Sequence, residues 1–92
     1  MRFTKEAATK RAKQDLAERL DVDPGSIEER SVTDVDFPDM SLGAAGKDEM
    51  AAQMISSGWR IDLGVEDRSF EYRADKYQLR LVGYEGRNHL VE

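Results

Sequence analysis

The chain has 92 residues, of which 36% are charged and 39% hydrophobic, and a formal net charge of −5. This length allows one domain with one core, and the absence of cysteine excludes a disulfide, a thiolate metal site and a cysteine nucleophile. Residues 21–67 hold twelve acidic and three basic side chains, which argues against nucleic acid as a partner because phosphates require a contiguous basic surface.

The first predicted element is a helix over residues 4–20. Small and apolar residues recur there at near four-residue spacing: Phe3, Ala8, Ala12, Leu16 and Leu20. Thr4 is a suitable N-cap, and Asp15 and Arg19 have the i,i+4 spacing of a helical ion pair. The abundance of alanine predicts that this helix packs closely against a sheet.

Four strands are predicted after the helix, over residues 27–37, 53–65, 69–75 and 77–83. The clearest is 53–65, where every second residue belongs to one expected buried face: Ile55, Ser57, Trp59, Ile61, Leu63 and Val65. In 27–37 the expected inner residues are Ser31, Thr33, Val35 and Phe37. Val32 is out of phase with them, which indicates a bulge or an edge strand.

The last two predicted strands continue the buried face with Phe70, Tyr72, Ala74, Tyr77, Leu79 and Leu81. Gln78 and Arg80 are expected to be exposed, and residues 83–92 to form a trailing segment. Short connections between consecutive strands favour antiparallel pairing. The sequence therefore predicts one α+β domain over residues 1–92, with an N-terminal helix packed on a curved, four-stranded antiparallel meander in the order α-β-β-β-β.

A long connection over residues 38–52, rich in Gly, Ala, Ser and Met, is the least regular segment. Loops of this length in small domains are functional or mobile, and methionine adapts to varied surfaces. The candidate binding residues, for an unknown protein partner, are Pro38, Asp39, Met40, Ser41, Leu42, Gly43 and Gln53. An alternative remains open, in which Leu42 plugs the core and Ser41 or Asp39 caps the turn.

Catalytic and metal-binding residues are scarce. His89 is the only histidine, no serine lies in a nucleophile elbow, and no glycine-rich loop joins a strand to a helix. Asp34, Asp36 and Asp39 could hold a hard cation, but we favour a solvated surface. We also favour a mixed-charge surface over an RNA-binding one for three arginines of the expected sheet: Arg60, Arg73 and Arg80. We therefore expect no enzyme, cofactor or metal ion.

No apolar segment is long enough to span a membrane, and the N-terminus lacks the apolar block of a signal peptide. We expect a monomer rather than an oligomer.

Four motifs occur within residues 15–82: Phe37-Pro38-Asp39-Met40-Ser41-Leu42-Gly43, Gln53, Gly58-Trp59-Arg60-Ile61 and Phe70-Glu71-Tyr72-Arg73-Ala74-Asp75. Together they resemble a family of small, largely uncharacterised bacterial proteins that are often exported or lipid-anchored. Ala44 stands where that family tends to have cysteine, and Arg73 where it tends to have histidine. The resemblance implies a cystatin-like or PepSY-like α+β domain and an exported or periplasmic parent protein, with no established activity.

A weaker resemblance is carried by Phe37-Pro38, by Phe70 to Asp75 and by Leu79 to Val82. These segments are similar to the potato inhibitor I family of serine protease inhibitors. This resemblance implies that Phe70 is presented to a protease, that Arg73 braces the inhibitory loop, and that a helix lies within residues 46–57. It is the alternative function to protein binding through the long loop.

Overall fold

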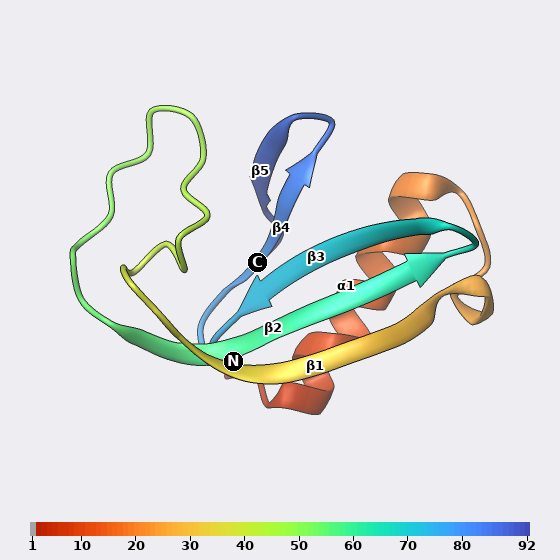
Figure 1. Ribbon diagram of the computed structural model, residues 1–92, viewed down its shortest axis with the longest axis horizontal. Coiled ribbons are helices and arrows are strands. Elements are labelled where there is room, and N and C mark those ends of the chain that lie inside the picture. Colours follow the sequence, from red (N-terminus) through yellow and green to blue (C-terminus); the bar gives the residue numbers. More distant parts are fainter. Residues whose placement is uncertain (1) are drawn as a thin grey trace.

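The computed structural model describes residues 2–92 and has one helix across one face of an open antiparallel sheet (Figure 1). The elements in chain order are α1 (Lys5–Leu20), a short 3₁₀ helix η1 (Pro24–Ser26), β1 (Glu28–Phe37), β2 (Ser56–Val65), β3 (Arg68–Ala74), β4 (Leu79–Tyr84) and β5 (Arg87–Leu90). The strand order follows the chain, β1-β2-β3-β4-β5. The predicted α+β class and the meander are therefore confirmed, with five strands and not four.

The fifth strand was missed because of its turn. Glu85 and Gly86 connect β4 to β5 and have φ values of 53° and 78°. Two successive left-handed residues are typical of the tight type I′ hairpin turn. Since Glu-Gly is not the Asn-Gly or Asp-Gly pair that usually signals this turn, the sequence did not predict a hairpin there.

The helix begins where it was predicted to begin. The backbone N–H of Ala7 donates to Oγ1 of Thr4 at 3.1 Å, so Thr4 is the N-cap. The buried face of α1 carries Ala8, Ala12 and Leu16, all without exposed surface. These small residues let the helix lie close to the sheet, where they pack against Ile61, Leu63, Tyr72, Leu79 and Leu81.

A row of paired residues crosses the sheet beneath α1: Val32, Ile61, Tyr72 and Leu81. The predicted inner set of β1 is therefore wrong, because Val32 faces the helix. Phe37, five residues later, faces the other side of the sheet. The predicted irregularity is present as a register shift between Glu29 and Ser31.

Two strands begin later than predicted. Ile55 precedes β2 and is 74% exposed, so its assignment to the buried face is wrong. Asp75 accepts hydrogen bonds from the backbone N–H groups of Tyr77 and Gln78, at 2.8 and 3.0 Å. This carboxylate-capped turn delays β4 until Leu79. Tyr77 is consequently exposed, and not buried as predicted.

A buried polar link joins α1 to the sheet. The hydroxyl of Tyr72 and Nε of Arg19 both donate to Oδ2 of Asp15, each at 2.7 Å. Burial, followed by the hydrogen bond to Asp15, raises the pKa of the Tyr72 phenol far above its ordinary value. Tyr72 therefore stays protonated and keeps donating to the carboxylate.

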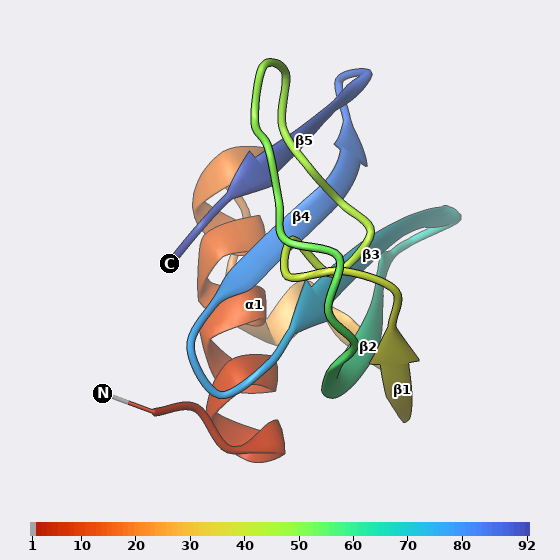
Figure 2. The same cartoon turned by 90° about the vertical axis from the view of Figure 1, so that its left-hand side faces the viewer.

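The loop over residues 38–55 covers part of the sheet face opposite α1 (Figure 2). Phe37, Leu42 and Ala44 are buried there, outside the cluster of side chains beneath the helix. The sheet thus has a helix on one face and a loop on the other. Within residues 2–92, no helix is long and apolar enough to cross a membrane.

Candidate functional site

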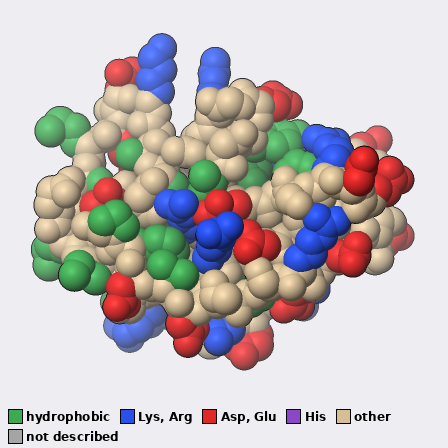
Figure 3. Space-filling view, viewed as in Figure 1, with side chains coloured by type: hydrophobic (Ala, Val, Ile, Leu, Met, Phe, Trp, Pro, Cys, Tyr) green, Lys and Arg blue, Asp and Glu red, His purple; other side chains and the backbone are tan. Residues whose placement is uncertain are grey.

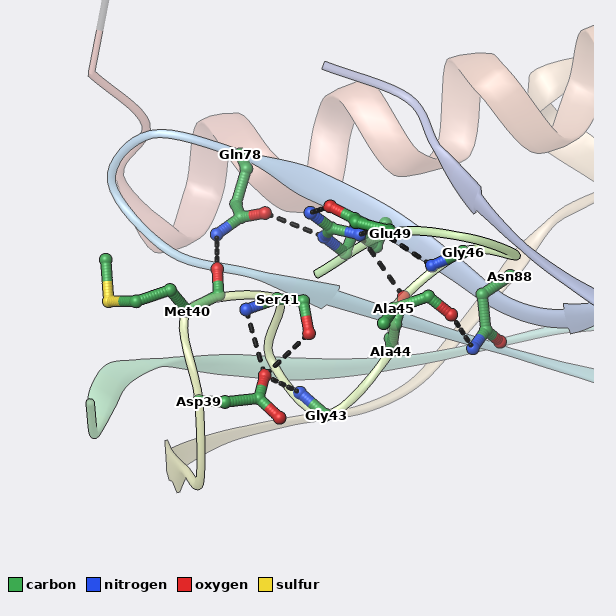
Figure 4. A network of polar contacts seen from close by, with 11 residues as sticks. Asp39, Met40, Ser41, Gly43, Ala44, Ala45, Gly46, Glu49, Gln78 and Asn88 are labelled. Atoms are coloured by element: carbon green, nitrogen blue, oxygen red, sulfur yellow. Dashed lines mark hydrogen bonds and ion pairs between the residues drawn. The ribbon is translucent and has the colours of Figure 1, made fainter. Parts of the chain in front are cut away.

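The first half of the loop is a turn built around one carboxylate oxygen (Figure 4). Oδ1 of Asp39 accepts from the N–H and the hydroxyl of Ser41, at 2.9 and 2.6 Å, and from the N–H of Gly43 at 3.0 Å. These bonds, with that of the Ser41 hydroxyl first, lower the pKa of Asp39. The carboxylate therefore stays ionised and holds the turn.

This turn directs Leu42 onto the sheet. Leu42 and Gly43 have left-handed backbones with φ of 61° and 66°, a conformation that suits glycine but strains leucine. The side chain of Leu42 is fully buried, and its carbonyl accepts from Nη1 of Arg73 at 2.9 Å. Leu42 thus plugs the loop side of the sheet and Asp39 caps the turn, which is the alternative that the sequence left open.

The second half of the loop is held by a buried arginine. Nη1 and Nη2 of Arg80 donate to the two carboxylate oxygens of Glu49, at 2.6 and 2.7 Å, and Nη1 also donates to the carbonyl of Ala44 at 3.3 Å. The bidentate bond to Arg80 is the main reason that the pKa of Glu49 falls to about 2. Glu49 also accepts from the N–H of Gly46 at 2.8 Å.

The prediction that Arg80 is exposed is therefore wrong, since only 5% of its surface is accessible. Alternation along β4 correctly places Arg80 on the face away from the helix, but nothing in the strand shows that a loop covers this face. The partner carboxylate, Glu49, was missed for the same reason. A single acid 31 residues away gives no local signal.

Amide side chains complete the attachment of the loop. Gln78 donates to the carbonyl of Met40 at 2.7 Å, and Asn88 of β5 donates to the carbonyl of Ala45 at 3.0 Å. At the neck of the loop, the N–H of Met40 donates to the carbonyl of Ala52 at 2.9 Å. The ends of the loop are thus fixed to the sheet while its outer part remains at the surface.

The seven predicted binding residues divide into two groups. Ser41 and Leu42 are buried and Asp39 is half-buried, so these three lie within the turn and under it. The other four are at the surface: Pro38, Met40, Gly43 and Gln53.

A group of exposed apolar residues lies on the same loop. Met50 is 96% exposed, Ile55 74%, Met54 63% and Met40 39%. We call these four residues the apolar loop surface. Figure 3 shows hydrophobic side chains at several separate points along the left edge of the molecule, where Figure 1 places the loop. The three methionines of the apolar loop surface could be found in the sequence, because methionine is typical of adaptable surfaces. Ile55 was missed because the sequence pattern assigned it to the predicted strand.

Beside the loop, the same sheet face is electrically balanced. Arg60 lies 3.3 Å from a carboxylate oxygen of Asp62 and 3.8 Å from one of Glu71, and Nε of Arg73 donates to Glu71 at 2.6 Å. Interleaved ion pairs leave no contiguous basic surface for a phosphate backbone. Within residues 2–92, no cluster of three or more acidic or histidine side chains could hold a metal ion.

These features define a class of small α+β domain, in which a helix covers one face of an antiparallel meander and a clamped loop covers part of the other. The chain belongs to the family described as "Domain of unknown function (DUF8738)", which matches residues 9–82. The match extends from α1 to β4 and includes the whole loop. Comparisons with curated proteins and with solved structures gave no match.

Proposed function

We propose that the chain is a non-enzymatic protein-interaction domain, which binds an apolar surface of a partner protein through the apolar loop surface. The observation that carries this proposal is the concentration of exposed side chains. Among residues 2–92, six large hydrophobic residues are exposed, and four of them belong to this one loop: Met40, Met50, Met54 and Ile55. Single exposed apolar residues are ordinary, whereas a group of them at one place is typical of an interaction site.

The attachment of the loop supports the same function. Arg80 and Glu49 hold one side of the outer segment, and the bond between Met40 and Ala52 closes its neck. A segment whose ends are already fixed loses less conformational entropy when a partner binds. Three of the four exposed apolar side chains are methionines, which can adjust to the partner at low cost.

The proposal also includes the kind of domain and the kind of parent protein that the sequence resemblance implies. A single helix on an antiparallel meander supports a cystatin-like or PepSY-like domain, and we retain the exported bacterial parent protein that the resemblance implies.

The inhibitor alternative has no specific observation in its favour. Phe70 lies inside β3, paired with Leu63, and is partly buried against the core. The guanidinium of Arg68 lies 4.9 Å from the Phe70 ring. Phe70 is therefore not displayed on an exposed loop, and the helix expected within residues 46–57 is absent from that segment.

The test places a photo-crosslinking amino acid at Met50, in cells that naturally produce the protein. The matched control places it at Glu18, which is exposed on α1 on the other side of the sheet. The proposal predicts a discrete crosslinked protein for position 50 and none for position 18. The same crosslinked species from both positions, or none from either, would contradict it.

A second arm asks whether the neighbouring apolar side chains contribute. Met54→Ser with Ile55→Ser, in the background that carries the crosslinker at position 50, should reduce the crosslinked species by about tenfold or more, since each buried apolar side chain contributes about 1.5–3 kcal/mol. Leu90→Ser on β5 removes a side chain of similar exposure, 62%, and should have no effect. Equal crosslinking by all three proteins would refute an apolar interface at the loop.

A further inference from the structure

The sheet has two edges of unequal length. β5 spans four residues and β1 spans ten, and each has only one neighbouring strand. In Figure 1, β1 forms the lower front edge of the sheet. One row of its backbone N–H and C=O groups pairs with β2, and the other row faces outward. Such an edge can pair with a strand from another chain.

The regular part of this edge is its second half. The register shifts between Glu29 and Ser31, and then runs without interruption from Ser31, opposite Asp62, to Phe37, opposite Ser56. A bulge disrupts pairing locally, so an added strand would find seven regularly spaced residues, from 31 to 37.

The charge of β1 determines which kind of strand can pair with its free edge. Asp34 and Asp36 are two residues apart and so lie on one face. The Asp34 side chain is 78% exposed although Nζ of Lys5 lies 3.1 Å from it, and Asp36 accepts from the hydroxyl of Ser57 at 2.8 Å. A second copy of β1 would place carboxylates opposite carboxylates, which is unfavourable.

The only basic residue of β1 points away from these carboxylates. Arg30 donates to the Ser69 hydroxyl at 2.6 Å and to the carbonyl of Glu66 at 2.7 Å, at the far end of the strand. The positive charges near Asp34 and Asp36 therefore come from Lys5 on the helix and from Lys76, which lines the hollow beside them. Asp34 and Asp36 are both exposed, so a basic strand added along β1 can bring further positive charge to them.

That hollow has a volume of about 470 Å³ and is lined by Asp34, Asp36 and Trp59, among others. Trp59 pairs with Asp34 across β1 and β2, and its indole is only half-buried. Since strands are spaced by about 4.8 Å, the indole is about 10 Å from an added strand. An extended arginine can cover most of this distance, lie between the two carboxylates and approach the aromatic ring.

We propose that the edge of β1 binds an extended segment of a partner protein that carries Lys or Arg at alternate positions. The segment adds a sixth strand along residues 31–37, and one of its basic side chains occupies the hollow between Asp34, Asp36 and Trp59. This surface consists of other residues than the apolar loop surface and adjoins it where Phe37 pairs with Ser56, next to Ile55.

The test uses a capped nine-residue peptide with arginine at alternate positions and threonine or valine between them. It is titrated into the ¹⁵N-labelled protein, and amide shifts are followed by NMR. We expect shifts along β1 and at the indole N–H of Trp59, with slowed amide exchange at alternate β1 residues. A peptide of equal charge with proline at two central positions should not bind, since proline removes the required N–H donors.

Two protein variants separate the charge of the edge from the total charge. Asp34→Asn with Asp36→Asn should weaken binding about three- to tenfold, as expected for two exposed ion pairs. Glu66→Gln with Asp67→Asn removes the same charge from the turn between β2 and β3, and should leave the affinity unchanged. Equal affinity for both variants, shifts confined to residues away from β1 and Trp59, or binding of the proline peptide would overturn the proposal. No binding at millimolar peptide, or self-association of the protein through β1, would overturn it equally.

Discussion

Replacement of Leu42 by alanine tests whether the loop belongs to the folded unit. The substitution removes three carbon atoms from a side chain with no exposed surface. At about 0.8 kcal/mol per methylene, the transfer term alone is about 2.4 kcal/mol. The cavity left behind adds to this cost, and measured Leu→Ala losses span about 2–5 kcal/mol.

The backbone contributes little to this difference. Leu42 has a φ of 61°, and alanine tolerates this left-handed conformation no better than leucine. Because one wall of the site is a surface loop that can settle into the space, we expect a loss of about 3 kcal/mol, in the lower half of the measured range.

The assay is urea unfolding followed by the fluorescence of Trp59 and by circular dichroism. Trp59 is on β2 and packs beside the core under α1, so its signal reports unfolding of the sheet and not of the loop alone. Met50→Ala is the matched control, since Met50 is 96% exposed, and should change the unfolding free energy by less than about 0.5 kcal/mol.

One result would refute the reasoning. If Leu42→Ala left the unfolding free energy within about 0.5 kcal/mol of the original protein, Leu42 would not be part of the cooperative core. Faster amide exchange confined to residues 38–55 would then show that the loop opens by itself.

Three further predictions concern the contacts that hold the two faces of the sheet. The pKa of Glu49 is about 2 against an ordinary value of 4.5, so its stabilising effect is complete above about pH 4.5 and is lost as the pH falls toward 2. Glu49→Gln should remove this part of the acid dependence of the urea midpoint, and parallel pH profiles for the two proteins would contradict it. Tyr72→Phe deletes the hydroxyl that donates to Asp15 and should cost about 1.5–3 kcal/mol in urea unfolding; a change under about 0.5 kcal/mol would show that the bond is dispensable. Gly58→Ala would drive a methyl group into the backbone of β3 and should cost about 1–3 kcal/mol. Gly46→Ala, whose methyl would meet its neighbours at 3.6 and 3.8 Å, should be neutral in the same urea unfolding assay. Equal losses in both variants would contradict the steric argument.

Hydrophobic periodicity correctly predicted the face of the sheet and the face of the helix that pack against each other. The alanine stripe of α1 and the alternation in β3 correctly placed Ala12 and Tyr72 in the core. Residues on the second face were misread, because alternation distinguishes two faces without showing what covers the outer one. Arg80 and Gly58 are buried by the loop or by close strand approach. Val32 is a separate error on the first face, because it was treated as out of phase although it faces the helix.

Local chemistry indicated half of the candidate site, as the alternative to a binding loop. Asp39 followed by Ser41 and Gly43 is a short-range pattern, in which a carboxylate satisfies nearby N–H groups, and the capped turn follows from it. The clamp between Glu49 and Arg80 joins a loop to a distant strand, and such pairing is set by the assembled fold. The sequence showed that methionines occur in and next to this loop, but it did not show that their side chains are exposed.

The neck that Met40 and Ala52 close with a backbone hydrogen bond has a practical consequence. A segment whose two ends are fastened can be lengthened cheaply, because each doubling of a flexible loop costs only about 0.6 kcal/mol in closure entropy. Foreign sequence grafted at Met50, beyond the side chain of Glu49 and before the neck, would leave the turn at Asp39 and the sheet in place. The domain is therefore suited to serve as a cysteine-free display scaffold.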